Sequence, residues 1–263
     1  MQHWVLCECL NELRKIYESL HLVTTHSMAP WSVPLANGIG KPCRRGFVRA
    51  ANRLSELEKP TVYESAWRKN SGPNGMPYPS SILFAKEVWE GQLSCSICEA
   101  SPVVAEEING WLGSVNVQES LQHSVLIRGD WRAAASSPEF LRTEASCVYV
   151  ECDPMRFDNR ELSERKSKDP QSLYPEDIEH IGNCLASVNK PLLVQVSSFS
   201  TQKNNIPLDV QRGKIVERFS PHGIELRAEA RVKMQMGSWV FTRNCEFGAS
   251  DLGERFATWL EAV

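Results

Sequence analysis

Four polar residues of this chain each stand where a short apolar segment ends. They are His26, Glu99, Asp130 and Asp153. In open α/β sheets, ligands bind beyond the carboxyl ends of the strands. A carboxylate at the second strand end can accept hydrogen bonds from ribose hydroxyls, and one at the third can hold an adenine amino group. A carboxylate at the fourth can face the reacting atom.

The order of these groups along the chain is typical of a class I methyltransferase that uses S-adenosylmethionine. In such an enzyme the sulfonium of the cofactor supplies the reactivity, so the protein mainly aligns and desolvates the reactants. We expect Asp153 to orient an acceptor amine so that the nitrogen lone pair points at the methyl carbon.

Hydrophobic periodicity predicts the elements that must position these residues. Strands are expected at 21–25, 93–99, 125–127, 147–150, 191–196, 213–219, 223–233 and 238–242, with a short extended segment at 61–63. Helices are expected at 1–20, 45–57, 81–89, 103–112, 175–187 and 251–261. The alternation predicts one α/β domain over residues 1–263 with a Rossmann-like, mostly parallel sheet.

Two segments are expected to interrupt this domain. Residues 31–60 are expected to form a small helical insertion. Residues 156–172 are expected to form a charged loop or lid, because 156–169 holds five basic and four acidic residues and has no clear apolar face.

Composition narrows the class of protein. The chain has 263 residues and a net charge of −3, which argues against binding nucleic acid by bulk charge alone. No apolar run approaches the roughly 20 residues of a membrane span, and the first residues lack the pattern of a signal peptide. Nine cysteines without such a signal indicate reduced thiols and a cytoplasmic protein.

The cysteine pair Cys95 and Cys98 has the spacing of a redox or zinc motif. It lies in an expected strand, whose alternation places the two side chains on opposite faces, and no second pair stands at metal spacing. We therefore interpret both as buried structural thiols and expect no metal.

The chain also resembles one family over almost its whole length: the large-subunit ribosomal RNA adenine-N6 methyltransferases, with the related three-Cys-motif partner proteins. The motifs that carry the resemblance are Gln2-His3-Trp4-Val5-Leu6, Thr24-Thr25-His26-Ser27-Met28-Ala29-Pro30, Tyr78-Pro79-Ser80-Ser81-Ile82, Glu99-Ala100-Ser101-Pro102, Asp130-Trp131, Asp153-Pro154-Met155-Arg156 and Gly237-Ser238-Trp239. The resemblance implies that S-adenosyl-L-methionine is bound by His3, His26, Ser81, Glu99, Asp130 and Trp131, and that Asp153 is catalytic.

The resemblance further implies a nucleic-acid substrate, RNA rather than DNA, and a role in rRNA processing. In such enzymes the acid and a backbone carbonyl bind the target amino group while an aromatic ring stacks on the flipped base. Pro154, Arg156 and Phe157 would then contact the substrate, with Phe157 as the stacking ring. From charge and position, four basic residues are expected to meet phosphates: Arg156, Arg165, Lys166 and Lys168.

Several positions depart from the family pattern and support a second hypothesis. Met28 and Pro30 replace the two glycines of the cofactor loop, and Thr24 replaces its first aspartate. The Asp-Pro motif lacks its second proline and its tyrosine. The alternative is a methyltransferase-like protein that has lost catalysis and serves in binding or regulation. A third hypothesis is a methyltransferase that acts on a protein or a small molecule.

Each residue also has an ordinary structural interpretation. His26 alone would be a hydrogen-bonded loop histidine, and Glu99 and Asp130 would be solvated acids at strand ends. Ser81 would be a helix N-cap, and Asp153 before a proline would begin a turn. Six polar residues in the right order are more specific than any one motif, so we favour the functional interpretation.

Overall fold

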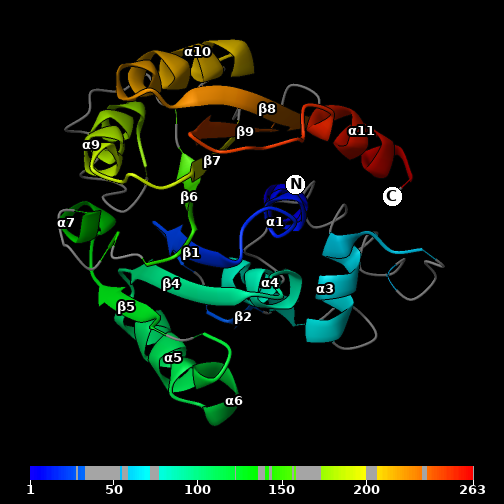
Figure 1. Cartoon of the computed structure of the whole chain (residues 1–263), viewed down its shortest axis with the longest axis vertical. Helices are drawn as coiled ribbons and strands as arrows, with labels where there is room; N and C mark the ends of the chain where they lie inside the picture. Colours follow the sequence, from blue (N-terminus) through cyan, green and yellow to red (C-terminus); the bar gives the residue numbers. More distant parts are fainter. Residues whose placement is uncertain are drawn as a thin grey trace.

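A computed structural model describes residues 1–27, 29–32, 54, 59–71, 77–121, 123–135, 140–141, 144–155, 157, 173–199, 206–232 and 236–262. These residues form a central sheet with helices on both of its faces (Figure 1). The expected helix at 45–57 and nearly all of the segments 31–60 and 156–172 lie outside the described residues.

The sheet has seven strands in the order β5-β4-β1-β6-β7-β9-β8. The strands β5, β4, β1, β6 and β7 are parallel, and β9 runs antiparallel to both β7 and β8. The expected α/β, Rossmann-like sheet is therefore confirmed. The seven strands of this sheet are β1 Ser19–Thr24, β4 Gln92–Glu99, β5 Val125–Arg128, β6 Cys147–Met155, β7 Leu192–Phe199, β8 Glu225–Val232 and β9 Met236–Arg243. A second, two-stranded sheet pairs β2 Trp31–Ser32 with β3 Tyr78–Pro79.

The helices cover two separate apolar cores. One core holds buried residues of α1, α3, α4 and α11, and the other holds those of α7, α9 and α10. Cys95 belongs to the first core and Cys98 to the second, as expected for opposite faces of β4. No described helix is long and apolar enough to cross a bilayer. The helices are α1 Gln2–Leu13, α3 Val62–Asn70, α4 Ser81–Val88, α5 Pro102–Leu112, α6 Val115–Gln118, α7 Trp131–Ala135, α9 Pro175–Ala186, α10 Leu208–Phe219, η1 Ser220–His222 and α11 Leu252–Ala262.

Two expected extended segments are helical in the structure, so those predictions were wrong. Residues 213–219 belong to α10, whose buried Leu208, Ile215 and Phe219 recur at helical spacing. Their spacing outweighs the β-branched residues that suggested a strand. Residues 62 and 63 begin α3, because Thr61 and Glu64 form a capping box that satisfies two backbone N–H groups at the start of the helix.

The capping box predicts a measurable loss of stability. Thr61 Oγ1 accepts the N–H of Glu64 at 3.3 Å, and Glu64 Oε2 accepts the N–H of Thr61 at 2.7 Å. We expect Thr61→Ala to lower the free energy of unfolding in urea by about 1 kcal/mol. Thr258→Ala at an exposed position of α11 is the control and is expected to change it by less than about 0.5 kcal/mol. Equal values for the two variants would contradict a stabilising cap.

Candidate functional site

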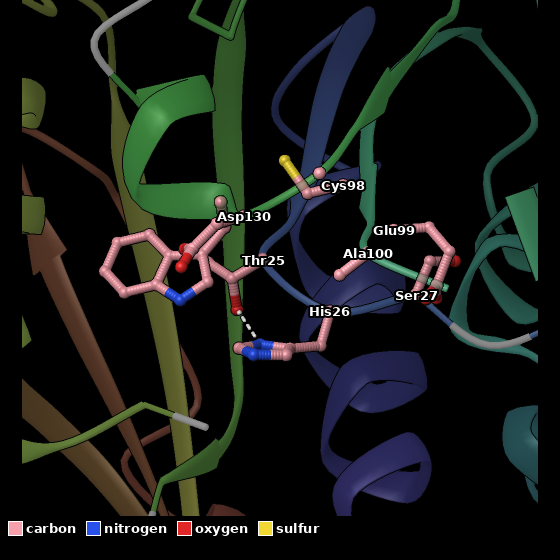
Figure 2. A pocket seen from close by; sticks show the side chains of 9 residues that line it. Thr25, His26, Ser27, Cys98, Glu99, Ala100 and Asp130 are labelled. Atoms are coloured by element: carbon pink, nitrogen blue, oxygen red, sulfur yellow. Dashed lines mark hydrogen bonds between the residues drawn. The ribbon is translucent and has the colours of Figure 1, made fainter. Parts of the chain in front are cut away.

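A pocket of about 110 Å³ opens at the carboxyl ends of β1, β4 and β5 (Figure 2). It brings together four of the residues expected to bind a cofactor, His26, Glu99, Asp130 and Trp131, which come from three strand ends. The other lining residues were not among those expected to bind a cofactor: Thr25, Ser27, Cys98, Ala100 and Gly129.

Hydrogen bonds hold the loop after β1 against both neighbouring strands. Thr25 donates its backbone N–H and its hydroxyl to the carbonyl of Glu151 in β6, at 3.1 and 3.2 Å. Because that hydroxyl is used as a donor, it accepts from His26 Nδ1, 3.1 Å away (Figure 2). The N–H of Ser27 bonds the carbonyl of Cys98 in β4 at 2.9 Å. The position of His26 is therefore set by β1, β4 and β6 together.

Glu99 ends β4 and its carboxylate is half-buried. Its Oε1 accepts the backbone N–H of Ser101, the N-cap residue of α5, at 2.7 Å. Burial raises the pKa of Glu99, and hydrogen bonds from the backbone N–H groups of Ser101 and Ala100 partly oppose that shift. The carboxylate is thus fixed in direction at the pocket wall, ready to accept hydroxyl hydrogen bonds in its ionised form.

The raised pKa of Glu99 predicts how ligand binding changes with pH. Only the ionised carboxylate accepts two hydroxyl hydrogen bonds, so affinity is expected to fall as pH falls through this pKa. Because burial raises the pKa, the loss should begin at a higher pH than for an ordinary glutamate. Titration calorimetry with S-adenosylhomocysteine from pH 8 downward measures it. In Glu99→Gln this component of the pH dependence should disappear, and its persistence would exclude Glu99 as the cause.

Asp130 is held by a chain of charges that runs into the core. Arg132 Nη1 lies 3.1 Å from Asp130 Oδ2, and the same guanidinium bonds Asp177 through Nε at 3.0 Å and Nη2 at 2.6 Å. Asp177 also accepts the N–H of Tyr174 at 2.9 Å, which anchors it at the start of α9. The guanidinium lies 4.9 Å from the ring centre of Trp131. Asp130 and Trp131 thus face the pocket from a rigid support.

Trp131 is buried and carries a polar atom without a partner. Its side chain is 2% exposed, and its indole Nε1 meets no hydrogen-bond acceptor in the described part of the chain. A buried donor left in this way is costly, so the ring is held here by packing. Its neighbours include His180, whose ring centre lies 6.1 Å away.

Gly129 turns the chain from β5 into the pocket. Its φ is +115°, and its N–H bonds the carbonyl of Glu99 at 3.0 Å. This conformation is one that residues with a Cβ rarely adopt. The sequence places Gly129 next to Asp130 but contains no signal for its φ, which only the structure shows.

Gly129→Ala is expected to destabilise the protein by about 1–3 kcal/mol, because the backbone must adopt a strained φ. Among the residues that the structure describes, a Cβ there would meet no atom within 4 Å, so the cost is conformational and not steric. The matched control is Gly110→Ala in α5, also with open space around the Cβ. It should stabilise by about 0.5–1 kcal/mol, since alanine favours the helix. Urea unfolding of both variants tests this contrast, and changes of the same sign would refute it.

His3 and Ser81 do not line this pocket but lie against each other. His3 Nε2 is 3.0 Å from Ser81 Oγ, and His3 Nδ1 is 2.9 Å from the hydroxyl of Tyr78. Burial lowers the pKa of His3 to about 3, so the imidazole is neutral at physiological pH. Their contact with a cofactor stays a prediction.

Asp153 and Pro154 lie within β6, which continues to Met155 instead of ending at residue 150. The pairing of β6 with β7 shifts register between Cys152 and Met155, so the strand is irregular at this point. Arg156 lies outside the described residues. Phe157 is 6% exposed and belongs to the apolar core under α7, α9 and α10. The catalytic and substrate roles of these residues stay predictions.

Neither a protein-family model nor a curated protein sequence matches this chain. Among solved structures, protein LPL1258 from Legionella pneumophila is similar, with a TM-score of 0.62 and 14% identity over 99% of this chain and 89% of that chain. At that identity the similarity shows a shared fold.

Two methyltransferase structures are more distant. A geranyl diphosphate methyltransferase in complex with S-adenosylmethionine has a TM-score of 0.43 and 7% identity, covering 92% of this chain and 85% of that one. A 16S rRNA adenine-N(1) methyltransferase from Catenulisporales acidiphilia has a TM-score of 0.39 and 10% identity, covering 94% and 93%. The strand order, with five parallel strands and β9 reversed between β7 and β8, is a Rossmann-like, mostly parallel α/β arrangement.

Proposed function

We propose that this protein is an S-adenosylmethionine-dependent methyltransferase. One observation carries the proposal: His26, Glu99 and Asp130, which are far apart in sequence, line a single pocket at the carboxyl ends of β1, β4 and β5. That edge of the sheet is where α/β folds bind their ligands.

The residues of the pocket fit the nucleoside part of the cofactor. Glu99 would accept hydrogen bonds from the ribose hydroxyls, and Asp130 would accept one from the adenine amino group. Trp131 lines the same pocket, and Gly129 carries no side chain at the turn between Glu99 and Asp130. His3, His26 and Ser81 would hold the rest of the molecule. When bound, the cofactor supplies an electrophilic methyl group.

The proposed acceptor is an amino group of a nucleic-acid base, an adenine of RNA by the family resemblance. Asp153 would orient the amine, and its carboxylate would accept a hydrogen bond from the N–H. Pro154 would contribute its carbonyl and Arg156 a phosphate contact. Phe157 would have to leave the apolar core in order to stack on the base. The large-subunit ribosomal RNA family and a role in rRNA processing belong to this proposal.

Transfer of a labelled methyl group from S-adenosylmethionine to total RNA tests the proposal. Wild-type protein should label RNA, Asp153→Ala should not, and Asp251→Ala, an exposed acid before α11, should match the wild type. Labelling by neither the wild type nor the control would contradict catalysis on RNA. Labelling that persists in Asp153→Ala would remove the catalytic role from that residue.

One observation favours the alternative of a methyltransferase-like binding protein without catalysis. Pro30, which stands where the resembling family has glycine, bonds the N–H of Ser80 through its carbonyl at 2.9 Å and fastens the loop to α4. This alternative predicts ligand binding without methyl transfer to any acceptor. A methyltransferase for proteins or small molecules would instead bind the cofactor and leave nucleic acid unlabelled.

A further inference from the structure

The side-chain hydroxyl of Thr25, at the pocket wall, makes two hydrogen bonds whose directions are fixed. Its oxygen lies 3.2 Å from the backbone carbonyl of Glu151, and a carbonyl oxygen can only accept. A hydroxyl has one hydrogen, so Thr25 Oγ1 donates it to that carbonyl. The contact with His26 Nδ1, at 3.1 Å, must then have the ring nitrogen as its donor (Figure 2). His26 Nδ1 therefore carries a hydrogen.

Burial of Thr25 makes the opposite arrangement unfavourable. Thr25 is 2% exposed, so its hydroxyl cannot exchange a protein partner for bulk water. If the hydroxyl turned and donated to His26 instead, only one of the two hydrogen bonds would form. The backbone N–H of Thr25 bonds the same carbonyl of Glu151 at 3.1 Å, which holds the residue against β6. The arrangement that makes both side-chain hydrogen bonds is therefore the stable one.

The hydrogen on Nδ1 decides the chemistry of the other ring nitrogen of His26. A neutral imidazole has one N–H, and the hydrogen bond made by one nitrogen sets the state of the other. With the hydrogen on Nδ1, Nε2 has none and can only accept. The opposite tautomer would donate through Nε2. Thr25 thus determines whether the ring of His26 is an acceptor or a donor at Nε2.

The charges of the pocket lining match a cationic donor on the ligand. Of the described residues that line the pocket, two are acids, Glu99 and Asp130, and none is a lysine or an arginine. A ring acceptor beside two acids suits a positively charged N–H group. A carboxylate would meet neither a cationic side chain of the lining nor an N–H at Nε2 of His26. In the methionine part of S-adenosylmethionine, the group that fits is the ammonium.

We propose that Thr25 is a positioning residue that holds His26 as the neutral Nδ1–H tautomer, so that Nε2 accepts a hydrogen bond from the ammonium group of S-adenosylmethionine. This inference rests on the proposed function and names the part of the cofactor that His26 meets. The sequence around Thr25 contains no sign of this role, because the carbonyl that sets the direction belongs to Glu151, 126 positions away.

Nitrogen NMR of histidine-labelled protein at about pH 8, where an ordinary histidine is neutral, measures the tautomer directly. The chain has six histidines, so the His26 signals are assigned as those missing from His26→Gln. Wild-type His26 should carry its hydrogen on Nδ1, and a wild-type Nε2–H would overturn the proposal without any further variant. Thr25→Val removes the hydroxyl at similar volume and should move the hydrogen to Nε2, the position that free histidine favours. Thr25→Ser keeps a hydroxyl and should retain the Nδ1–H.

Thr24→Val is the matched control for Thr25→Val. Thr24 is 1% exposed, and its hydroxyl meets no hydrogen-bond partner among the residues that the structure describes. The variant loses the same buried group one position earlier and should leave the His26 tautomer unchanged. The same change of tautomer in both valine variants would overturn the specific role of Thr25.

Calorimetric titration with two ligands tests which group His26 meets. Thr25→Val should weaken binding of S-adenosylhomocysteine by about five- to tenfold, and that of methylthioadenosine, which lacks the ammonium, by less than about twofold. Thr25→Ser should change neither affinity by more than about twofold. Equal losses for both ligands in Thr25→Val would overturn the assignment to the ammonium, as would unchanged affinities despite a changed tautomer. If the wild type binds neither ligand, the proposed function fails, while the NMR spectrum still decides whether Thr25 sets the tautomer of His26.

Discussion

Glu99→Ala is expected to weaken binding of S-adenosylmethionine and S-adenosylhomocysteine by about 10–100-fold. Hydrogen bonds to a charged group contribute about 1.5–3 kcal/mol each, and here the carboxylate would accept those of the ribose. The half-buried position of Glu99 at the pocket wall makes the loss larger than for an acid in open solvent. Isothermal titration calorimetry of purified protein measures it directly.

Two controls separate this effect from damage to the fold. Glu106→Ala removes an exposed acid of α5 that pairs with Arg128, outside the pocket lining, and should leave the affinity unchanged. Because Glu99 also accepts the N–H of Ser101, the urea unfolding of Glu99→Ala shows how much stability is lost with that bond. A folded Glu99→Ala protein with wild-type affinity would contradict the proposed nucleoside site.

Asp177→Ala is expected to lower the free energy of unfolding by about 3–5 kcal/mol, the cost of breaking a buried ion pair from one side. The Asp177 side chain is 6% exposed and meets the Arg132 guanidinium through both oxygens. Its removal takes the two-point carboxylate partner from that guanidinium, which is 19% exposed and also pairs with Asp130. The N–H of Tyr174 at the start of α9 also loses its carboxylate acceptor. Urea unfolding measures the loss.

Asp177→Ala is also expected to weaken ligand binding at the pocket. Arg132 joins Asp177 to Asp130, so ligand affinity in Asp177→Ala should fall by about three- to tenfold even where the protein remains folded. Asp209→Ala is the matched control, because Asp209 is exposed and pairs with Arg231 on the surface. It should cost less than about 1 kcal/mol and leave binding unchanged. Similar losses of stability and affinity in the two variants would show that the buried ion pair contributes no more than the exposed one.

Most of the fold could be predicted from local patterns. The parallel strands and α5, α9 and α11 lie close to the predicted ranges, because a buried strand or an amphipathic helix leaves its period in consecutive residues. The first helix was predicted too long: it ends at Leu13 instead of residue 20, and β1 begins at Ser19. The two segments that were wrongly predicted as strands were also judged from neighbouring residues alone. Residues 61–63 and 213–219 hold β-branched side chains that favour strands, whereas a capping box and the burial of one helical face decide the outcome.

The residues of the candidate site, like the fold, were predicted correctly only in part. Four acidic, histidine or tryptophan positions at strand ends were identified from the sequence, and the structure places them in one pocket. His3 and Ser81 were identified as well, but they pair with each other outside its lining. Asp153 was expected after a strand and lies inside one, since β6 continues past residue 150 with an irregular pairing to β7.

The sequence by itself determined the alternation of strands and helices and the polar residues at the strand ends, because both are encoded by neighbours along the chain. Only the tertiary structure decided what supports those residues. Gln2 and Glu151 meet across 149 positions, and Arg132 and Asp177 across 45. Hydrogen bonds of such separation leave no periodic trace in the sequence, and they form only once the sheet has brought their strands and helices together.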